Sequence, residues 1–222
     1  MTQEQFTAMR QAVIDGDAAA ATRLAEEALA TGVPPLDAIE NGFVPGLGYV
    51  GEQFGMGELF LPDMMLAARA MQKAIAVLEP EMQRQATHRQ VLGRVVLGTV
   101  KGDIHEIGKN LVGMMLSTSG FEVHDLGVDV APERFVEAAR EHEADLVGVS
   151  ALLTTTMSGQ RTVVEAFAAA GLRDRVRIIV GGAPASASWA SEIGADGYSE
   201  DAIGAVALAR QLLGVPEPAV TG

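Results

Sequence analysis

The chain of 222 residues contains no cysteine. Disulfide bonds, thiolate metal sites and cysteine nucleophiles are therefore excluded, and a transition metal could be held only by histidine, by carboxylates or within a prebuilt cofactor. Basic residues are also few, because 16 lysines and arginines face 29 aspartates and glutamates, for a formal net charge of −13. A nucleic-acid partner would need a clustered basic face, which this sequence does not show, so no such partner is expected.

Long apolar runs are missing as well. No stretch of the sequence reaches the length needed to span a bilayer, and Gln3, Glu4 and Gln5 stand where a secretory signal would carry positive charge and then an apolar run. These features predict a cytoplasmic protein without a membrane partner. Hydrophobic residues make up 48% of the chain, which is enough to form the core of one large or two small packed domains.

The first third of the chain has helical periodicity throughout. Apolar stripes at helical spacing are separated by short glycine-containing breaks. The pattern predicts four helices, over residues 2–15, 18–31, 35–54 and 62–78. These helices indicate a four-helix bundle over residues 1–80, followed by a polar linker over residues 81–92 that would tether a second domain.

From residue 93 to residue 222 the sequence alternates between short β-branched runs and helical patterns. Strands are predicted over residues 95–100, 121–126, 146–150, 176–180 and 197–198. Helices are predicted over residues 107–119, 132–142, 157–170, 185–193 and 201–213. The alternation predicts a flavodoxin-like, Rossmann-like α/β domain with a doubly wound parallel five-stranded sheet.

An Asp-x-His pair, Asp103 and His105, follows the first predicted strand. Ligands of open α/β sheets bind at the carboxyl ends of the strands, so a histidine in this loop can reach a cofactor. The carboxylate could also hold the second ring nitrogen of the imidazole and fix its tautomer. An isolated pair of this kind is equally consistent with a local polar contact.

Two further unusual segments follow the third and fourth predicted strands. Residues 150–156 contain three consecutive threonines, whose hydroxyls could line the crevice or simply cap the next helix. Gly181 and Gly182 allow a close backbone approach to a ligand, or a tight turn. Because the sequence has neither G-x-G-x-x-G after the first strand nor a P-loop, a dinucleotide or a nucleotide is not the predicted ligand.

Taken together, the chain resembles the cobalamin-binding methyl-carrier (corrinoid) proteins and the equivalent two-domain module of cobalamin-dependent methionine synthase. The resemblance covers nearly the whole chain. Residues 50–62, V-G-E-Q-F-G-M-G-E-L-F-L-P, look like the family's cap over the cobalamin. The motifs D-x-H-x-x-G, S-x-L and G-G stand here as Asp103, His105 and Gly108, as Ser150 and Leu152, and as Gly181 and Gly182.

This resemblance implies that His105 is the lower axial ligand of the cobalt, in place of the cofactor's own dimethylbenzimidazole (base-off/His-on binding). Asp103 and Thr156 fall where the family links a carboxylate and a hydroxyl to that histidine, and we expect them to relay a proton to it when it leaves the metal. The family's best-known member has serine at the Thr156 position, so the hydroxyl is kept but its geometry can differ. The other implied cofactor-binding residues are Gly102, Ile104 and Glu106 in the motif loop, Ser150, Leu152, Thr154, Gly181, Gly182 and Ala202 near the nucleotide tail, and Glu40, Phe54 and Leu61 in the cap.

By the same resemblance the chain is a non-catalytic carrier subunit in one-carbon metabolism. A substrate-specific methyltransferase would load the cobalt with a methyl group from a donor such as a methylamine, betaine, methanol or a methoxyaromatic compound. A second methyltransferase would pass it to tetrahydrofolate or a thiol, and a reductive activating protein would rescue oxidised cobalt.

Two alternatives share part of this pattern, namely an adenosylcobalamin mutase subunit and a cobalamin-dependent light sensor or regulator. The cap sequence around Phe54 counts against the mutase, and the lack of a basic DNA-binding region before the bundle counts against the sensor.

Two further groups of residues are expected to be uninvolved in binding. Bundle core is the favoured role for Met56, Met64 and Met65, and the histidines His88, His124 and His142 are expected to be solvated.

Overall fold

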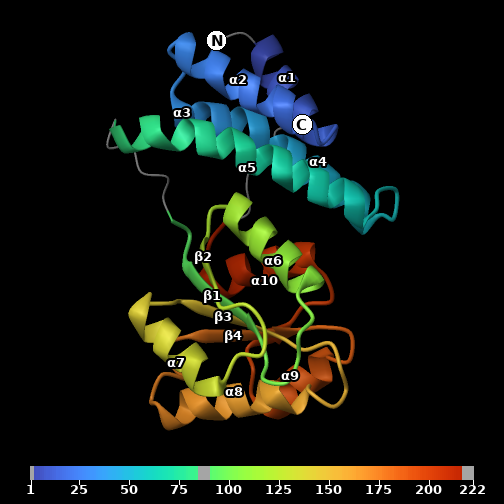
Figure 1. Ribbon diagram of the computed structural model, residues 1–222, viewed down its shortest axis with the longest axis vertical. Coiled ribbons are helices and arrows are strands. Elements are labelled where there is room, and N and C mark those ends of the chain that lie inside the picture. The colour runs from blue at the N-terminus through green and yellow to red at the C-terminus, as the bar shows by residue number, and fades with distance from the viewer. Residues whose placement is uncertain (1–2, 85–90, 217–222) are drawn as a thin grey trace. The chain divides into compact units, whose positions relative to one another are not determined.

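The computed structural model describes residues 3–84 and 91–216, and the chain divides into two compact units at Val91 (Figure 1). The first unit is all-helical, and the second alternates strands with helices. Within the described ranges, no helix combines the length and the apolar character needed to cross a bilayer.

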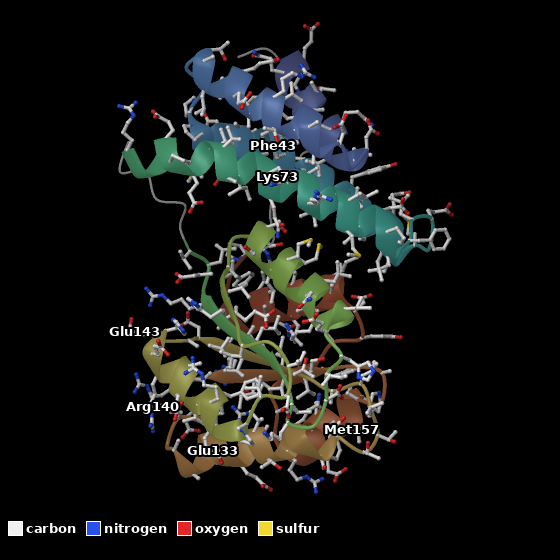
Figure 2. All side chains as sticks on the ribbon, in the orientation of Figure 1. Phe43, Lys73, Glu133, Arg140, Glu143 and Met157 are labelled. Carbon is white, nitrogen blue, oxygen red and sulfur yellow. The ribbon has the colours of Figure 1, made fainter. Side chains whose placement is uncertain are left out.

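The helical unit is built around four long helices, α1 (Gln3–Ile14), α2 (Ala18–Ala30), α4 (Val44–Gly55) and α5 (Leu61–Arg84). Helix α2 packs closely on α5 through a face of small residues, since Ala21, Ala25 and Ala28 recur at helical spacing and are all buried. Figure 2 labels one residue from the core of this unit, Phe43, and one from its surface, Lys73. Phe43 is fully buried, whereas Lys73 on α5 is exposed.

The third predicted helix, residues 35–54, is helical but not uniform. It consists of α3 (Pro35–Asp37), a π-helical segment η1 (Ala38–Phe43) and α4. The wide turn ends where the Val44 amide donates to the Ile39 carbonyl, five residues back. The next residue, Pro45, has no N–H and its ring would clash with a regular helical turn, so the wider turn accommodates it.

The prediction of a linker over residues 81–92 is wrong for its first residues, which are helical. Helix α5 continues through Pro80 to Arg84. Two contacts hold this last turn: Met82 is buried, and the Arg84 guanidinium donates to both carboxylate oxygens of Glu81, at 2.6 and 2.7 Å. Side-chain packing outweighs the one backbone hydrogen bond that the proline removes. The rest of the predicted linker includes residues 85–90, which lie outside the described part.

Gly46 allows α4 to approach α1 closely, and this contact supports a prediction. A Cβ atom at Gly46 would lie 2.5 Å from the Arg10 carbonyl oxygen, whereas one at Gly48, in the same helix, would meet nothing within 4 Å. We expect Gly46→Ala to lower the free energy of unfolding of the helical unit by about 1–3 kcal/mol. Gly48→Ala should raise it by roughly 0.5–1 kcal/mol, because alanine favours helix.

Urea unfolding of the full-length variants, followed by circular dichroism, measures the difference. A Gly46→Ala protein as stable as the Gly48→Ala protein would contradict the close packing of the two helices.

The second unit contains a parallel five-stranded sheet in the order β2-β1-β3-β4-β5, the doubly wound arrangement that the alternation predicts. The strands are β1 (Arg94–Thr99), β2 (Glu122–Asp125), β3 (Leu146–Ser150), β4 (Arg177–Gly181) and β5 (Gly197–Tyr198). The helices are α6 (Ile107–Thr118), α7 (Pro132–Glu141), α8 (Ser158–Ala169), α9 (Ala187–Ile193) and α10 (Ala202–Leu213).

Alternate residues of the three inner strands β1, β3 and β4 enter two separate cores, one on each face of the sheet. Val96 and Ile178 lie in a core with side chains of α7, α8 and α9, whereas Val95 and Ile179 lie in a core with α6 and α10. Figure 1 shows helices covering both faces. Since both faces are buried, the strands read as continuous apolar runs, and polar residues collect where the strands end.

Candidate functional site

His105 lies in the loop between β1 and α6, at the carboxyl end of the central part of the sheet. Gly102 turns this loop with a positive φ of 82°, a conformation that favours glycine. The Thr99 hydroxyl, at the end of β1, donates to the His105 carbonyl at 2.9 Å. The loop is therefore tied to the strand from which it departs, and the His105 side chain remains 45% exposed.

The carboxylate of Asp103 is the centre of the site and is fully buried. One oxygen accepts from the His105 backbone N–H at 3.1 Å and lies 2.7 Å from the His105 Nδ1 atom. The other oxygen accepts from the Thr156 hydroxyl at 2.6 Å and from the backbone N–H groups of Leu152 and Leu153 at 2.8 and 3.3 Å. This carboxylate thus joins the loop after β1 to the segment after β3.

The same contacts decide the charge of Asp103 and the tautomer of His105. Burial by itself raises the pKa of Asp103, but the hydrogen bonds from Thr156, His105 and Leu152 outweigh it and hold the pKa far below its usual range. An ionised carboxylate can only accept, so the proton of a neutral imidazole sits on Nδ1. The Nε2 atom then carries a free lone pair, the form that binds metals.

The threonine segment does not cap the following helix. Helix α8 begins after Met157, which is labelled in Figure 2. The start of this helix receives no side-chain cap hydrogen bond. The Thr156 hydroxyl instead contacts Asp103 and lies 3.0 Å from the Leu153 carbonyl oxygen. Capping alone is therefore wrong for Thr156, because the buried carboxylate is the stronger acceptor.

The glycine pair after β4 is a point of close backbone approach. Gly181 pairs in register with Ser150 of β3. Gly182 has φ of 112°, and a Cβ atom there would lie only 1.8 Å from the Ala151 carbonyl oxygen. The fully buried Gln160 amide donates to the Gly181 and Val149 carbonyls at 2.9 Å each, so side-chain bonds hold the two strand ends together.

The structure brings part of the predicted site into one bonded cluster and leaves other members separate. The directly connected residues are Asp103, His105, Leu152 and Thr156. Ala202 begins α10 and is buried, and Thr154 is exposed. The three predicted cap residues belong to the helical unit, with Glu40 in η1, Phe54 in α4 and Leu61 at the start of α5.

Exposed apolar side chains belong to both segments that meet at the Asp103 carboxylate, and sequence reasoning identified only some of them. Ile104 is 75% exposed and Leu152 42%, both as members of the predicted site. Ile107 and Leu153 are similarly exposed at 71% and 42% but were not assigned to the site. Ile107 reads in the sequence as the first apolar residue of a helix, and Leu153 as the apolar residue before the threonines. Together they offer a flat apolar ligand a surface beside the imidazole.

The helical unit also has exposed apolar side chains. The core role favoured for the methionines holds for Met64, which is fully buried, but is wrong for Met56 and Met65, which are 58% and 45% exposed. Phe60, which belongs to the cap motif over residues 50–62, is 68% exposed, and its amide donates to the Asp63 carboxylate at 2.8 Å. Apolar residues at helical spacing predict a buried face, so only the packed structure distinguishes these positions.

The remaining histidines differ in part from expectation. His124 and His142 are half-buried and stacked, with ring centroids 3.7 Å apart, and each has a glutamate partner, Glu122 at 3.0 Å and Glu141 at 4.0 Å. The expectation that they are solvated is therefore wrong, because α7 ends against the edge strand β2. His88 lies outside the described residues.

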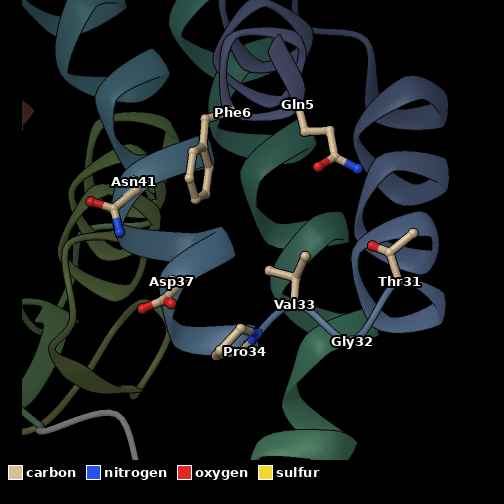
Figure 3. Close-up of a pocket in the computed structure, with 8 residues that line it drawn as sticks. All are labelled: Gln5, Phe6, Thr31, Gly32, Val33, Pro34, Asp37 and Asn41. Atoms are coloured by element: carbon tan, nitrogen blue, oxygen red, sulfur yellow. The ribbon is translucent and has the colours of Figure 1, made fainter. Parts of the chain in front are cut away.

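A separate pocket of about 550 Å³ lies in the helical unit, as Figure 3 shows. Its lining comes from α1, from the connection between α2 and α3, from α3 and from η1, and none of it belongs to the predicted site. The lining residues are Gln5, Phe6, Thr31, Gly32, Val33, Pro34, Asp37 and Asn41.

Comparison with known proteins identifies the ligand of this fold. The protein-family model described as a B12 binding domain matches residues 93–207, and a second model with the same description matches residues 5–79. The trimethylamine corrinoid protein 2 of Methanosarcina mazei is 46% identical over 213 residues, which cover 96% of this chain and 98% of that protein. The dimethylamine corrinoid protein 2 of the same organism is 51% identical over 179 residues, or 81% and 83% of the two chains.

A solved structure supports the same family relationship. A chain of the methanol:cobalamin methyltransferase complex from Methanosarcina barkeri matches with a TM-score of 0.85 at 26% identity, over 97% of this chain and 82% of that one. Fold and matches together define a cobalamin-binding protein, with the fold class predicted from the sequence. The chain belongs to the methyltransferase corrinoid proteins, as its motifs predicted.

The residues present fit cobalamin on structural grounds. His105 offers a metal one imidazole nitrogen, held in the correct tautomer by Asp103. The histidine loop and the segment that binds Asp103 both carry exposed apolar side chains, which suit an apolar macrocycle. The backbone at Gly182 has no room for a side chain, because the Ala151 backbone occupies that space and brings the two strand ends close together.

Proposed function

We propose that the protein is a corrinoid methyl carrier that binds cobalamin base-off/His-on, with His105 Nε2 as the lower axial ligand. The observation that carries this proposal is the 2.7 Å contact between His105 Nδ1 and the buried carboxylate of Asp103, which leaves Nε2 as the free nitrogen. When bound, the corrin would supply a cobalt centre to which a methyl group can be attached and from which it can be transferred.

Asp103 and Thr156 have the role of a proton relay in this proposal. The ionised carboxylate lies 2.7 Å from Nδ1, so the pair would be placed to pass a proton to His105 when Nε2 is not engaged with the metal. The Thr156 hydroxyl supports the same carboxylate at 2.6 Å and adjusts how strongly it attracts the imidazole proton.

The other predicted residues divide into three groups around the cofactor. Gly102, Ile104 and Glu106 shape the histidine loop beneath the corrin. Ser150, Leu152, Thr154, Gly181, Gly182 and Ala202 receive the nucleotide tail. Glu40, Phe54 and Leu61 would belong to the cap, in which the apolar side chains of Phe54 and Leu61 would exclude water and oxygen from the cofactor.

Relatives support the choice of partners. Their names connect them with trimethylamine and dimethylamine, and the solved complex with methanol and a cobalamin methyltransferase. We propose that a substrate-specific methyltransferase loads this chain, that a second one transfers the methyl group to tetrahydrofolate or a thiol, and that a reductive activating protein restores oxidised cobalt. A methyl-transfer assay with candidate partner enzymes and a panel of methylamines and methanol tests the donor.

Replacing His105 by alanine tests the axial ligand. We expect reconstituted His105→Ala protein to lose the absorption spectrum of histidine-ligated cobalamin and to bind the cofactor at least about tenfold more weakly, because one coordinate bond is lost. His124→Ala is the matched control, since it removes a histidine of the same unit outside the site, and it should keep both properties. An unchanged spectrum in His105→Ala would refute the assignment.

A further inference from the structure

Asp129 adopts a backbone conformation that is unusual for aspartate. Within residues 3–84 and 91–216 it is one of two non-glycine residues with positive φ, at 55°. Such conformations cost energy and persist where surrounding contacts require them, often next to functional sites. Asp129 belongs to the loop between β2 and α7, so it reaches the histidine loop from a different part of the chain.

Two reciprocal hydrogen bonds connect Asp129 to the histidine loop. Its Oδ1 atom accepts from the Gly102 N–H at 2.8 Å, and its own N–H donates to the Asp103 carbonyl at 2.9 Å. Gly102 also has a positive φ, so two left-handed residues hold each other in place. The Lys101 ammonium lies 3.7 Å from the same Oδ1 atom.

The following residue continues this connection. The Val130 N–H donates to the Thr99 carbonyl at 3.0 Å, and Val130 bridges to Val100 in parallel. The backbone of Asp103 is therefore held from outside its own loop, on both its N-terminal and its C-terminal side. Since its carboxylate must meet donors from two segments at once, a small displacement of this backbone would break some of those bonds.

We propose that Asp129 is a positioning residue for the axial ligand. Through Gly102 and the Asp103 carbonyl it sets the direction of the Asp103 carboxylate, and the carboxylate in turn sets the orientation of His105. This inference rests on the proposed function only in that His105 is taken as the ligand.

Three substitutions separate the side-chain acceptor from the backbone strain. Asp129→Asn keeps an oxygen acceptor and tolerates the left-handed conformation. Asp129→Gly relieves the strain but removes the acceptor, and Asp129→Ala removes the acceptor and keeps the strain. Asp174→Ala is the control, because it removes an exposed aspartate of the same unit.

Hydrogen exchange of the Gly102 amide in the full-length chain, with and without cobalamin, is the first measurement. We expect exchange to become roughly tenfold faster in Asp129→Ala and Asp129→Gly, as for the loss of one hydrogen bond. Asp129→Asn and Asp174→Ala should exchange at the original rate. Wild-type protection in Asp129→Gly would overturn the proposal, and so would an Asp129→Asn protein that behaves like Asp129→Ala.

The absorption spectrum of the cobalamin-loaded protein is the second measurement. The ratio of histidine-bound to histidine-free cofactor should fall by roughly tenfold in Asp129→Ala and Asp129→Gly, and Asp129→Asn should restore it. An unchanged ratio in Asp129→Ala overturns the positioning role if His105→Ala has lost the histidine signature. If His105→Ala keeps that signature, the proposed function itself fails.

Discussion

The variant Gly182→Ala is expected to lose cobalamin binding and to destabilise the α/β unit by about 3 kcal/mol or more. An added Cβ atom would lie 1.8 Å from the Ala151 carbonyl oxygen and 2.7 Å from its carbon, so backbone has to move. Little movement is available, because the Ala151 N–H donates to the Gly181 carbonyl and Gln160 binds that same carbonyl. The displaced strand would carry Leu152 away from the Asp103 carboxylate.

Gly171→Ala is the matched control for this variant. Gly171 also has a positive φ, 69°, but a Cβ atom there would meet nothing within 4 Å. The Gly171→Ala substitution should lower the free energy of unfolding only by the conformational penalty of alanine at positive φ, about 1 kcal/mol. Urea unfolding and a cobalamin titration of both variants measure the difference, and equal losses would show that the close approach at Gly182 is unimportant.

The second large effect is expected for Asp103→Ala. The substitution removes the acceptor of three backbone amides, of the Thr156 hydroxyl and of the His105 ring, and buried donors without a partner cost about 1–3 kcal/mol each. We expect a loss of stability of roughly 3 kcal/mol or more and a mixed tautomer of His105. Asp103→Asn should be nearly as harmful, because its NH₂ group would face donors in either orientation.

The lowered pKa of Asp103 also predicts how the free energy of unfolding depends on pH. The pKa of Asp103 is lower in the folded chain than in the unfolded chain, so its contribution to stability is complete above the unfolded pKa of about 4. That contribution is lost as the pH falls toward the folded pKa. Wild-type protein should therefore lose more stability than Asp103→Ala between pH 5 and pH 3, by a difference on the order of 1 kcal/mol. The free energies of unfolding of both proteins are measured by urea unfolding at each pH. If they fell in parallel between pH 5 and pH 3, Asp103 would not have the lowered pKa.

Most elements of the fold could be predicted from the sequence. The strand at residues 146–150 is predicted with the bounds that the structure shows, and helix α6 ends one residue before the predicted end. Such agreement is expected, because parallel strands buried on both faces leave apolar runs, and helices leave apolar stripes. The π-helical turn before Pro45 and the helix beyond Pro80 were not predicted, because local signals at a proline cannot show how strongly the neighbouring side chains pack.

Some residues of the candidate site could likewise be predicted from the sequence, and others could not. Asp103 and His105 can be proposed from their spacing, since residues two apart in a loop can share a hydrogen bond. Asp129 could not, because it lies 27 residues from the Gly102 amide that it accepts from. The one local signal, an aspartate in a loop after an edge strand, is too common to single it out.

The sequence by itself determined the elements, the alternation that makes the sheet parallel, and the residues available for chemistry at the strand ends. Those properties follow from periodicity and composition, which act over a few residues. Only the tertiary structure decided that the amide of Leu152, 49 residues from Asp103, binds its carboxylate, and that Gly182 touches the Ala151 carbonyl. Both contacts depend on the register of β1, β3 and β4, and this register is set by the packing of the whole sheet.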